Sequence, residues 1–154
     1  MFGSDRNDAM DLSAARASAV RMLSRREHAA QELLQKLIGK GCDADTAATA
    51  VAWCQDNGLQ SEQRFIESFV RQRRERLYGP RRIRAELVAK GVAESLISAQ
   101  LEDDADWLAA ARQFVARKAV DLSEYKQRGK VYQALLRRGF TAQQASTAVH
   151  STDE

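Results

Sequence analysis

The same pattern of hydrophobic and polar residues occurs three times along the chain. Each copy of the pattern contains a basic residue followed by a glycine, where a turn is expected. The three glycines are Gly41, Gly91 and Gly139, which lie 50 and 48 residues apart. The position four before each glycine is leucine, and the positions eight before, three before, one after, six after and ten after it are all apolar. A register that recurs at about this spacing is typical of helical repeat proteins. The equivalent apolar positions are Leu33, Ile83 and Val131; Leu37, Leu87 and Leu135; Ile38, Val88 and Leu136; Cys42, Val92 and Phe140; Ala47, Ile97 and Ala145; and Val51, Leu101 and Val149.

Each copy is predicted to contain three short helices. The apolar residues between Ala30 and Ile38 have the spacing of a helix that buries one face, and Ser24 to Glu27 is the expected capping box at its start. A glycine such as Gly41 accepts the left-handed backbone that ends a helix, and Asp43 is expected to cap the helix that follows.

The second copy repeats this plan with its own start and stop signals. Ser61 is expected to cap its first helix, and Gly79-Pro80 to separate that helix from the next, which should bury Ile83, Leu87 and Val88. No stretch alternates with a period of two residues over a useful length, so no sheet is expected. We predict an all-α fold of three tandem three-helix repeats, about nine helices in all, elongated or curved, with repeats at 12–58, 59–103 and 104–150. The two ends, Met1 to about Met10 and Ser151 to Glu154, are expected to be mobile.

Composition narrows the functional classes. The chain has 154 residues, 44% of them hydrophobic and 29% charged, which is typical of a folded water-soluble protein. No run approaches the length of a membrane-spanning helix and the N-terminal segment is unlike a signal peptide, so we expect a cytoplasmic protein. Cys42 and Cys54 lack metal-ligand or redox-motif spacing and are expected to be buried, reduced thiols.

Catalytic and metal-binding patterns are absent from the sequence. His28 and His150 have no second ligand at a suitable spacing, and both are expected at exposed or helix-end positions. The acidic run Glu102 to Asp106 is explained by the dipole of the helix that begins there. Neither a P-loop, a nucleophile elbow nor a zinc pattern occurs. We therefore expect no enzyme, no metal and no cofactor.

An arginine cluster is the strongest functional lead. Eight arginines fall between Arg64 and Arg84, a stretch that holds only Glu67 and Glu75 as acids. Guanidinium groups bind phosphate and carboxylate through paired donors, so the cluster favours an anionic partner, either nucleic acid or an acidic protein surface. A solvated helix face with cations near a helix C-terminus is the alternative. The third copy carries a similar basic face, and the tyrosines among these charges, Tyr78, Tyr125 and Tyr132, could stack on bases or pack in the protein boundary.

Several of these segments together resemble the RecX family, regulators of the RecA recombinase. The central signature is Tyr78 to Leu87, which reads YGPRRIRAEL, preceded by Arg64-Phe65 and Phe69 to Arg71 and followed by Lys90 to Val92. The resemblance extends over about residues 14 to 149. It also includes Ser24 to Glu27, Leu33 to Gly41, the pair Asp106-Trp107, and Leu135 to Phe140.

The resemblance implies a regulator of homologous recombination, DNA repair and the SOS response. Such proteins bind RecA on single-stranded DNA, lie along the groove of the filament, and inhibit ATP hydrolysis and strand exchange. A direct single-stranded DNA-binding protein that competes for DNA, and an inert scaffold, are the alternatives. We expect a monomer without membrane contact. The residues expected to face the RecA filament or DNA are Arg71, Arg74, Arg81, Arg82, Arg84, Arg137 and Arg138.

The tandem arrangement predicts an elongated monomer, because repeats that contact only their neighbours do not close into a sphere. A compact chain of this length would have a radius of gyration of about 15 Å. Small-angle X-ray scattering is expected to give a clearly larger value at the mass of a monomer. The compact value at that mass would contradict the arrangement.

Overall fold

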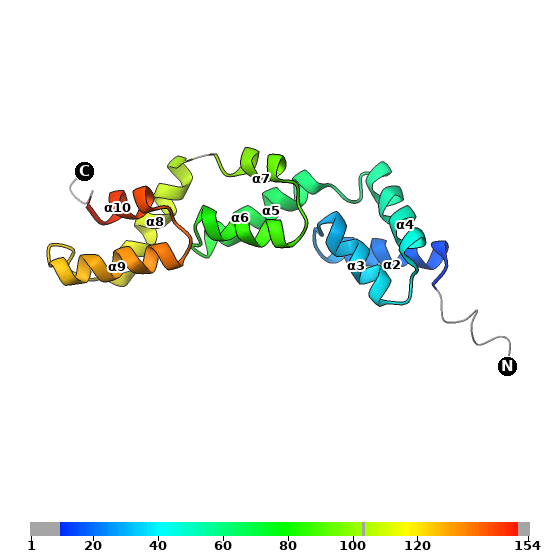
Figure 1. The fold of residues 1–154 in the computed structure, drawn as a ribbon, viewed down its shortest axis with the longest axis horizontal. Helices are drawn as coiled ribbons and strands as arrows, with labels where there is room; N and C mark the ends of the chain where they lie inside the picture. The colour runs from blue at the N-terminus through cyan, green and yellow to red at the C-terminus, as the bar shows by residue number, and fades with distance from the viewer. Residues whose placement is uncertain (1–9, 103, 151–154) are drawn as a thin grey trace. The chain divides into compact units, whose positions relative to one another are not determined.

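The described part of the chain is entirely helical. The computed structural model describes residues 10–102 and 104–150, and within them the chain forms nine helices and no strand (Figure 1). The helices are α2 (Leu12–Arg25), α3 (Ala30–Gly39), α4 (Ala44–Asp56), α5 (Glu62–Glu75), α6 (Pro80–Ala89), α7 (Glu94–Gln100), α8 (Asp104–Lys118), α9 (Tyr125–Arg137) and α10 (Ala142–His150). The predicted all-α class is confirmed. The expectation of mobile ends and the predicted repeat boundary at Asp103 fall on residues outside the described ranges. No helix of residues 10–102 and 104–150 is both long enough and apolar enough to cross a membrane.

Most helix ends follow the local rules predicted from the sequence. The three repeat glycines have positive φ angles, 105° at Gly41, 80° at Gly91 and 101° at Gly139, as a left-handed helix end requires. Oδ1 of Asp43 accepts a hydrogen bond from the Thr46 amide at 2.8 Å, so the predicted cap is confirmed. The Ser61 hydroxyl does the same for the amide of Arg64 at 3.2 Å.

The predicted capping box at Ser24 to Glu27 is wrong. Helix α2 continues through Arg25, so Ser24 lies inside it, and α3 begins only at Ala30. The N-cap of α3 is Ala29, which has no side-chain oxygen. Oε1 of Glu32 instead accepts a hydrogen bond from the Ala29 amide at 3.3 Å, which supplies one half of a capping box.

The helices fall into two compact units. The first contains the residues up to Ser68 together with Lys90–Leu96, and the second contains Phe69–Ala89 together with the residues from Ile97 onward. Packing defines these units, whereas the sequence register defines the three repeats. The repeat boundaries therefore stay a prediction.

The core of the first unit lies among α2, α3 and α4, which pack on one another. Leu33, Leu37 and Ala47 are fully buried there, as the repeat register predicts. Cys42 and Cys54 are buried free thiols, which confirms the prediction for them. Burial raises the pKa of both thiols, so they stay protonated at neutral pH and react poorly.

The core of the second unit contains α8, α9 and α10, which pack together, and the inner face of α6. Leu87 and Leu135 are fully buried, as predicted, and so is Phe140. Val88 was also predicted to be buried, and this is wrong, because its exposed fraction is 52%. Its equivalents in the other repeats, Ile38 and Leu136, are only half-buried, so this register position lies at the edge of the buried stripe.

A buried polar junction holds the start of α3 in the first unit. His28 lies at a helix end, as expected, two residues before α3 begins, but it is not exposed: its exposed fraction is 3%. Its Nδ1 lies 3.1 Å from the Arg26 carbonyl oxygen and its Nε2 lies 3.1 Å from Nζ of Lys36. A neutral ring with the proton on Nδ1 satisfies both contacts, since that nitrogen then donates and Nε2 accepts from the ammonium group.

Two acids complete this junction. Nη2 of Arg26 lies 2.6 Å from Oε2 of Glu32, and the Lys36 and Lys90 ammonium groups lie 3.8 and 3.9 Å from the same oxygen. Burial alone would raise the pKa of Glu32, but Arg26, through its hydrogen bond and its charge, and then Lys90 lower that pKa overall. Oε1 of Glu62 accepts a hydrogen bond from the Ala30 amide at 2.8 Å, so the start of α5 caps the start of α3.

The second unit contains a close approach of two backbone segments. The Gly79 amide donates to the Arg138 carbonyl at 2.8 Å, and the Arg81 amide donates to the Gly139 carbonyl at 2.8 Å. A Cβ at Gly79 would lie 2.3 Å from the carbonyl carbon of Gly139 and from the amide nitrogen of Phe140. We call this paired contact the glycine clamp. It fixes the start of α6 against the turn after α9.

The junction predicts that stability falls as the pH drops from 7.5 to 5.5. Burial lowers the pKa of His28 below its ordinary value of 6.5, so the unfolded chain binds a proton more readily than the folded chain in this range. Protonation would also face the imidazolium with the Lys36 ammonium, while Glu32 remains ionised. Urea denaturation should show the loss in the wild-type chain and a flatter profile in His28→Gln. His150→Gln controls for the loss of an imidazole, and an unchanged profile in His28→Gln would contradict the assignment.

The clamp predicts opposite effects for two glycine substitutions. Gly79→Ala should lower the free energy of unfolding by about 1–3 kcal/mol or more, because the added methyl group meets backbone atoms that cannot move independently. Gly129→Ala is the matched control, since a Cβ there meets no atom within 4 Å. It lies inside α9 and should raise stability by about 1 kcal/mol. Denaturant melts measure both, and equal effects at the two positions would rule out a steric role for Gly79.

Candidate functional site

All seven arginines expected at the partner-binding surface belong to the second unit, but their environments differ. They are Arg71 and Arg74 on α5, Arg81, Arg82 and Arg84 on α6, Arg137 at the end of α9, and Arg138 just after it. Some hold the protein together and others are open to solvent. The contacts of each side chain separate the two groups.

Tyr78 brings two of these arginines together. The guanidinium carbon of Arg82 lies 4.2 Å from the centre of the Tyr78 ring, and that of Arg138 lies 4.0 Å from it. Both cations are therefore within the range of favourable interaction with the π system. Tyr78 directly precedes Gly79, so this stack of two cations on a ring lies beside the glycine clamp.

Arg138 has a structural task. Its Nε donates to the Leu77 carbonyl at 3.1 Å, and its Nη2 donates to the Arg76 carbonyl. Leu77 has a φ of 64°, a left-handed value that costs a leucine about 1 kcal/mol or more, and it is 4% exposed. Arg138 thus binds two carbonyls just after the end of α5, which occupies two of its donors within the protein.

Arg74 and Arg84 are tied to neighbouring helices. Nη1 of Arg74 lies 4.0 Å from Oδ2 of Asp106, and its guanidinium carbon lies 5.3 Å from the centre of the Trp107 ring. Nη1 of Arg84 donates to the Ser98 hydroxyl at 3.3 Å. Both side chains are half-buried. Arg84 is therefore less open to solvent than Arg81 and Arg82, which are exposed on the same helix.

Three of the seven arginines are open. Arg71, Arg81 and Arg137 are exposed, and within the described ranges none of them has a side-chain hydrogen bond or ion pair. Arg81 and Arg137 flank the glycine clamp, because the Arg81 amide bonds to Gly139, two residues beyond Arg137. No contact among the described residues links Arg71 to this pair. We call Arg71, Arg81 and Arg137 the open arginines.

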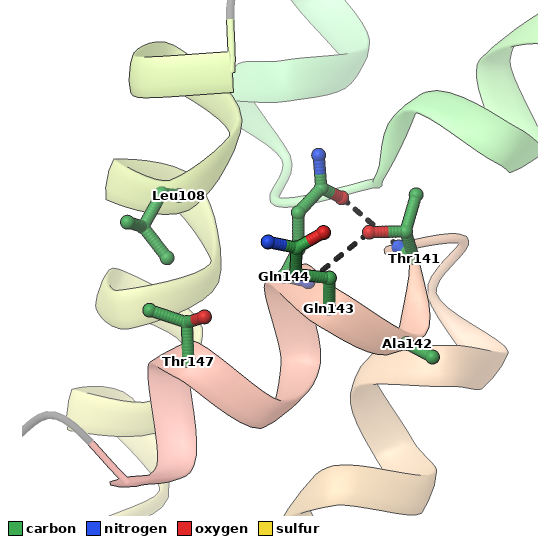
Figure 2. Close-up of a pocket in the computed structure, with 6 residues that line it drawn as sticks. All are labelled: Leu108, Thr141, Ala142, Gln143, Gln144 and Thr147. Atoms are coloured by element: carbon green, nitrogen blue, oxygen red, sulfur yellow. Dashed lines mark hydrogen bonds between the residues drawn. The ribbon is translucent and has the colours of Figure 1, made fainter.

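A cavity that the sequence reasoning missed lies between α8 and the start of α10. It has a volume of about 500 Å³, and Figure 2 shows Leu108 on α8 facing Thr147 of α10 across it. The Gln144 amide donates to the Thr141 hydroxyl at 3.1 Å, and Oε1 of Gln144 accepts from the Thr141 amide at 2.9 Å. This reciprocal capping box was legible in the sequence as threonine followed three residues later by glutamine. None of the described residues that line it is ionisable, so these residues offer the cavity no general acid or base.

Metal ligation has no support in the described part of the chain. No three side chains of His, Cys, Asp or Glu lie together there as ligands would. Asp106, from the acidic run, instead pairs with Arg74. The chemistry of the site is thus that of arginine and aromatic contacts.

Protein-family comparison matches three consecutive segments of the chain. Residues 15–54 match the first three-helix domain of RecX, residues 61–101 the second, and residues 104–149 the third.

Whole-length relatives agree with these matches. The regulatory protein RecX of Halorhodospira halophila is 42% identical over 144 residues, which cover 92% of this chain and 89% of the relative. The regulatory protein RecX of Vibrio campbellii is 38% identical, with coverage of 89% and 90%. The crystal structure of RecX from Lactobacillus salivarius matches the fold with a TM-score of 0.79 at 22% identity, covering 93% of this chain and 97% of that one. The glycine clamp and the arginines around it therefore belong to a chain that is a member of the RecX family of regulatory proteins.

Proposed function

We propose that this protein regulates the RecA recombinase in the cytoplasm. It binds RecA filaments on single-stranded DNA and inhibits their ATP hydrolysis and strand exchange, which modulates recombination, DNA repair and the SOS response. Membership of the RecX family over almost the whole chain is the observation that carries this proposal. The three predicted repeats, 12–58, 59–103 and 104–150, would then contact successive protomers of the filament.

The open arginines are the proposed contacts. Arg71, Arg81 and Arg137 have donors that the described part of the protein does not use, so each can form paired hydrogen bonds to a carboxylate or phosphate. Arg82 is exposed and contributes charge while its guanidinium rests on Tyr78. The other three arginines hold the surrounding helices in place through contacts within the protein; they are Arg74, Arg84 and Arg138.

Competition for DNA is the second candidate function. Guanidinium groups bind phosphate as well as carboxylate, so the open arginines also fit a bare DNA strand. A RecA regulator and a DNA competitor differ in whether they bind the RecA filament or bare DNA more tightly. Cosedimentation with RecA filament and with bare strand of equal length separates them, because a filament regulator binds the filament more tightly.

Charge reversal tests the proposed surface. The triple variant Arg71→Glu, Arg81→Glu and Arg137→Glu should raise the concentration that half-inhibits ATP hydrolysis by preformed RecA filaments about tenfold or more, since like charges across an interface are costly. All three side chains are exposed, so the variant should retain its helical circular dichroism.

A matched control changes the net charge equally at other exposed positions. It combines Arg21→Glu, Arg25→Glu and Arg117→Glu. Only the open-arginine variant should lose inhibition. Full inhibition by that folded variant would eliminate this surface, and no inhibition by the wild-type chain at saturation would refute the proposed function itself.

A further inference from the structure

One face of α9 forms an open basic groove, which adjoins the glycine clamp only through Arg137. The groove has a volume of about 590 Å³. It is lined by Tyr125, Lys126, Gly129, Lys130, Gln133 and Arg137. From Tyr125 to Arg138 the sequence has five basic residues and no acid. A face with this charge favours an anionic partner.

Tyr125 is the unusual member of this face. Its exposed fraction is 80%, larger than that of the other exposed large hydrophobic residues among those described. The guanidinium carbon of Arg128 lies 5.9 Å from the ring centre, and Nη1 of the same arginine donates to the Leu122 carbonyl at 3.1 Å. Tyr78, by contrast, has two arginines within 4.2 Å of its ring centre. The fold does not use most of the surface of the Tyr125 ring.

Gly129 keeps that ring accessible. Glycine weakens the interior of a helix, and here packing does not require it, because a Cβ would meet no atom within 4 Å. Side chains on a helix lean toward its N-terminus, so a side chain at position 129 would cover the turn that begins with Tyr125. The glycine therefore leaves space beside the ring.

We propose that this face of α9 binds single-stranded nucleic acid, with a base stacked on Tyr125 and phosphates bound by Lys126, Lys130 and Arg137. The two lysines are one helical turn apart, about 6 Å along the axis, and Arg137 lies roughly 10 Å further. A row of cations that begins at an exposed aromatic ring suits a strand with unpaired bases, since every base offers a π face for stacking. The proposal rests on the second candidate function, direct binding of single-stranded DNA, and deepens it by naming the face and the aromatic contact that would carry it. Regulation of RecA does not depend on this site.

Binding of two labelled strands separates stacking from charge. One is an oligodeoxythymidine and the other an abasic strand with the same number of phosphates, and fluorescence anisotropy at fixed salt measures both. Tyr125→Ala should weaken binding of the thymidine strand about fivefold or more and leave the abasic strand unaffected. Tyr125→Phe should bind both strands as the wild type does. An equal effect of Tyr125→Ala on the two strands, or none on either, would overturn the stacking contact.

The lysines should act on both strands alike. Lys126→Gln with Lys130→Gln should weaken both and reduce the salt slope by roughly 1.4 in log affinity per decade of salt, about 0.7 for each lost phosphate contact. Lys40→Gln with Arg117→Gln removes two charges at exposed positions elsewhere and should change neither binding nor slope noticeably. Equal losses in the two pairs would show only a general charge effect.

Substitution of Gly129 is expected to keep the protein folded, because a Cβ there meets no atom within 4 Å. Gly129→Leu should stabilise α9 and yet weaken binding of the thymidine strand, because the new side chain covers the ring, while Gly129→Ala should bind nearly as the wild type does. Polyglutamate serves as a competitor of similar charge. Displacement of the strand by polyglutamate at equal charge concentration, with the same dependence on Tyr125, would assign this face to acidic protein instead.

Discussion

The packing of the second unit depends on a contact between two backbone segments that lie too close together for a side chain to fit between them. At the glycine clamp the contact is made by amides and carbonyls, and the nearest atoms to the missing Cβ of Gly79 are backbone atoms of Gly139 and Phe140. Backbone hydrogen bonds are directional, so this contact fixes orientation as well as distance. Tyr78 and Arg138 extend the contact to either side. The open arginines Arg81 and Arg137 take their positions from it.

The repeat register predicts the core well because burial is periodic. Leucine four residues before each repeat glycine is fully buried in all three copies, and the left-handed glycines follow from the same alignment. Val88 shows the limit of this reasoning. A hydrophobic residue at the edge of the apolar face of a helix has the spacing of a buried residue even when no other helix covers it. Helical spacing alone does not show which neighbouring helix is present.

The candidate site was predictable as a region but not residue by residue. Arg137 and Arg138 are adjacent and chemically identical, yet one is open and the other binds two carbonyl groups from a segment about 60 residues earlier. Nothing local distinguishes them, because the distinction depends on which residue reaches the end of α5. The burial of His28 was missed for the same reason: its partner Lys36 is near in sequence, but its burial comes from tertiary packing. Tyr125 was noted among the basic residues, and only its exposure in the structure separates it from Tyr78.

The left-handed Leu77 has a consequence for the order in which the chain folds. A glycine in place of Leu77 would adopt the left-handed backbone without strain, but it would leave the buried space of the leucine side chain unfilled. The backbone preference of leucine therefore does not by itself produce the turn that follows α5. Arg138 holds it from a distance of 61 residues in sequence. The loop between them must close before this bond forms, and closing it costs chain entropy that no local contact repays. We therefore expect the end of α5 to be a late element of folding, completed when α9 docks, and Arg81 and Arg137 to reach their final positions in the same step.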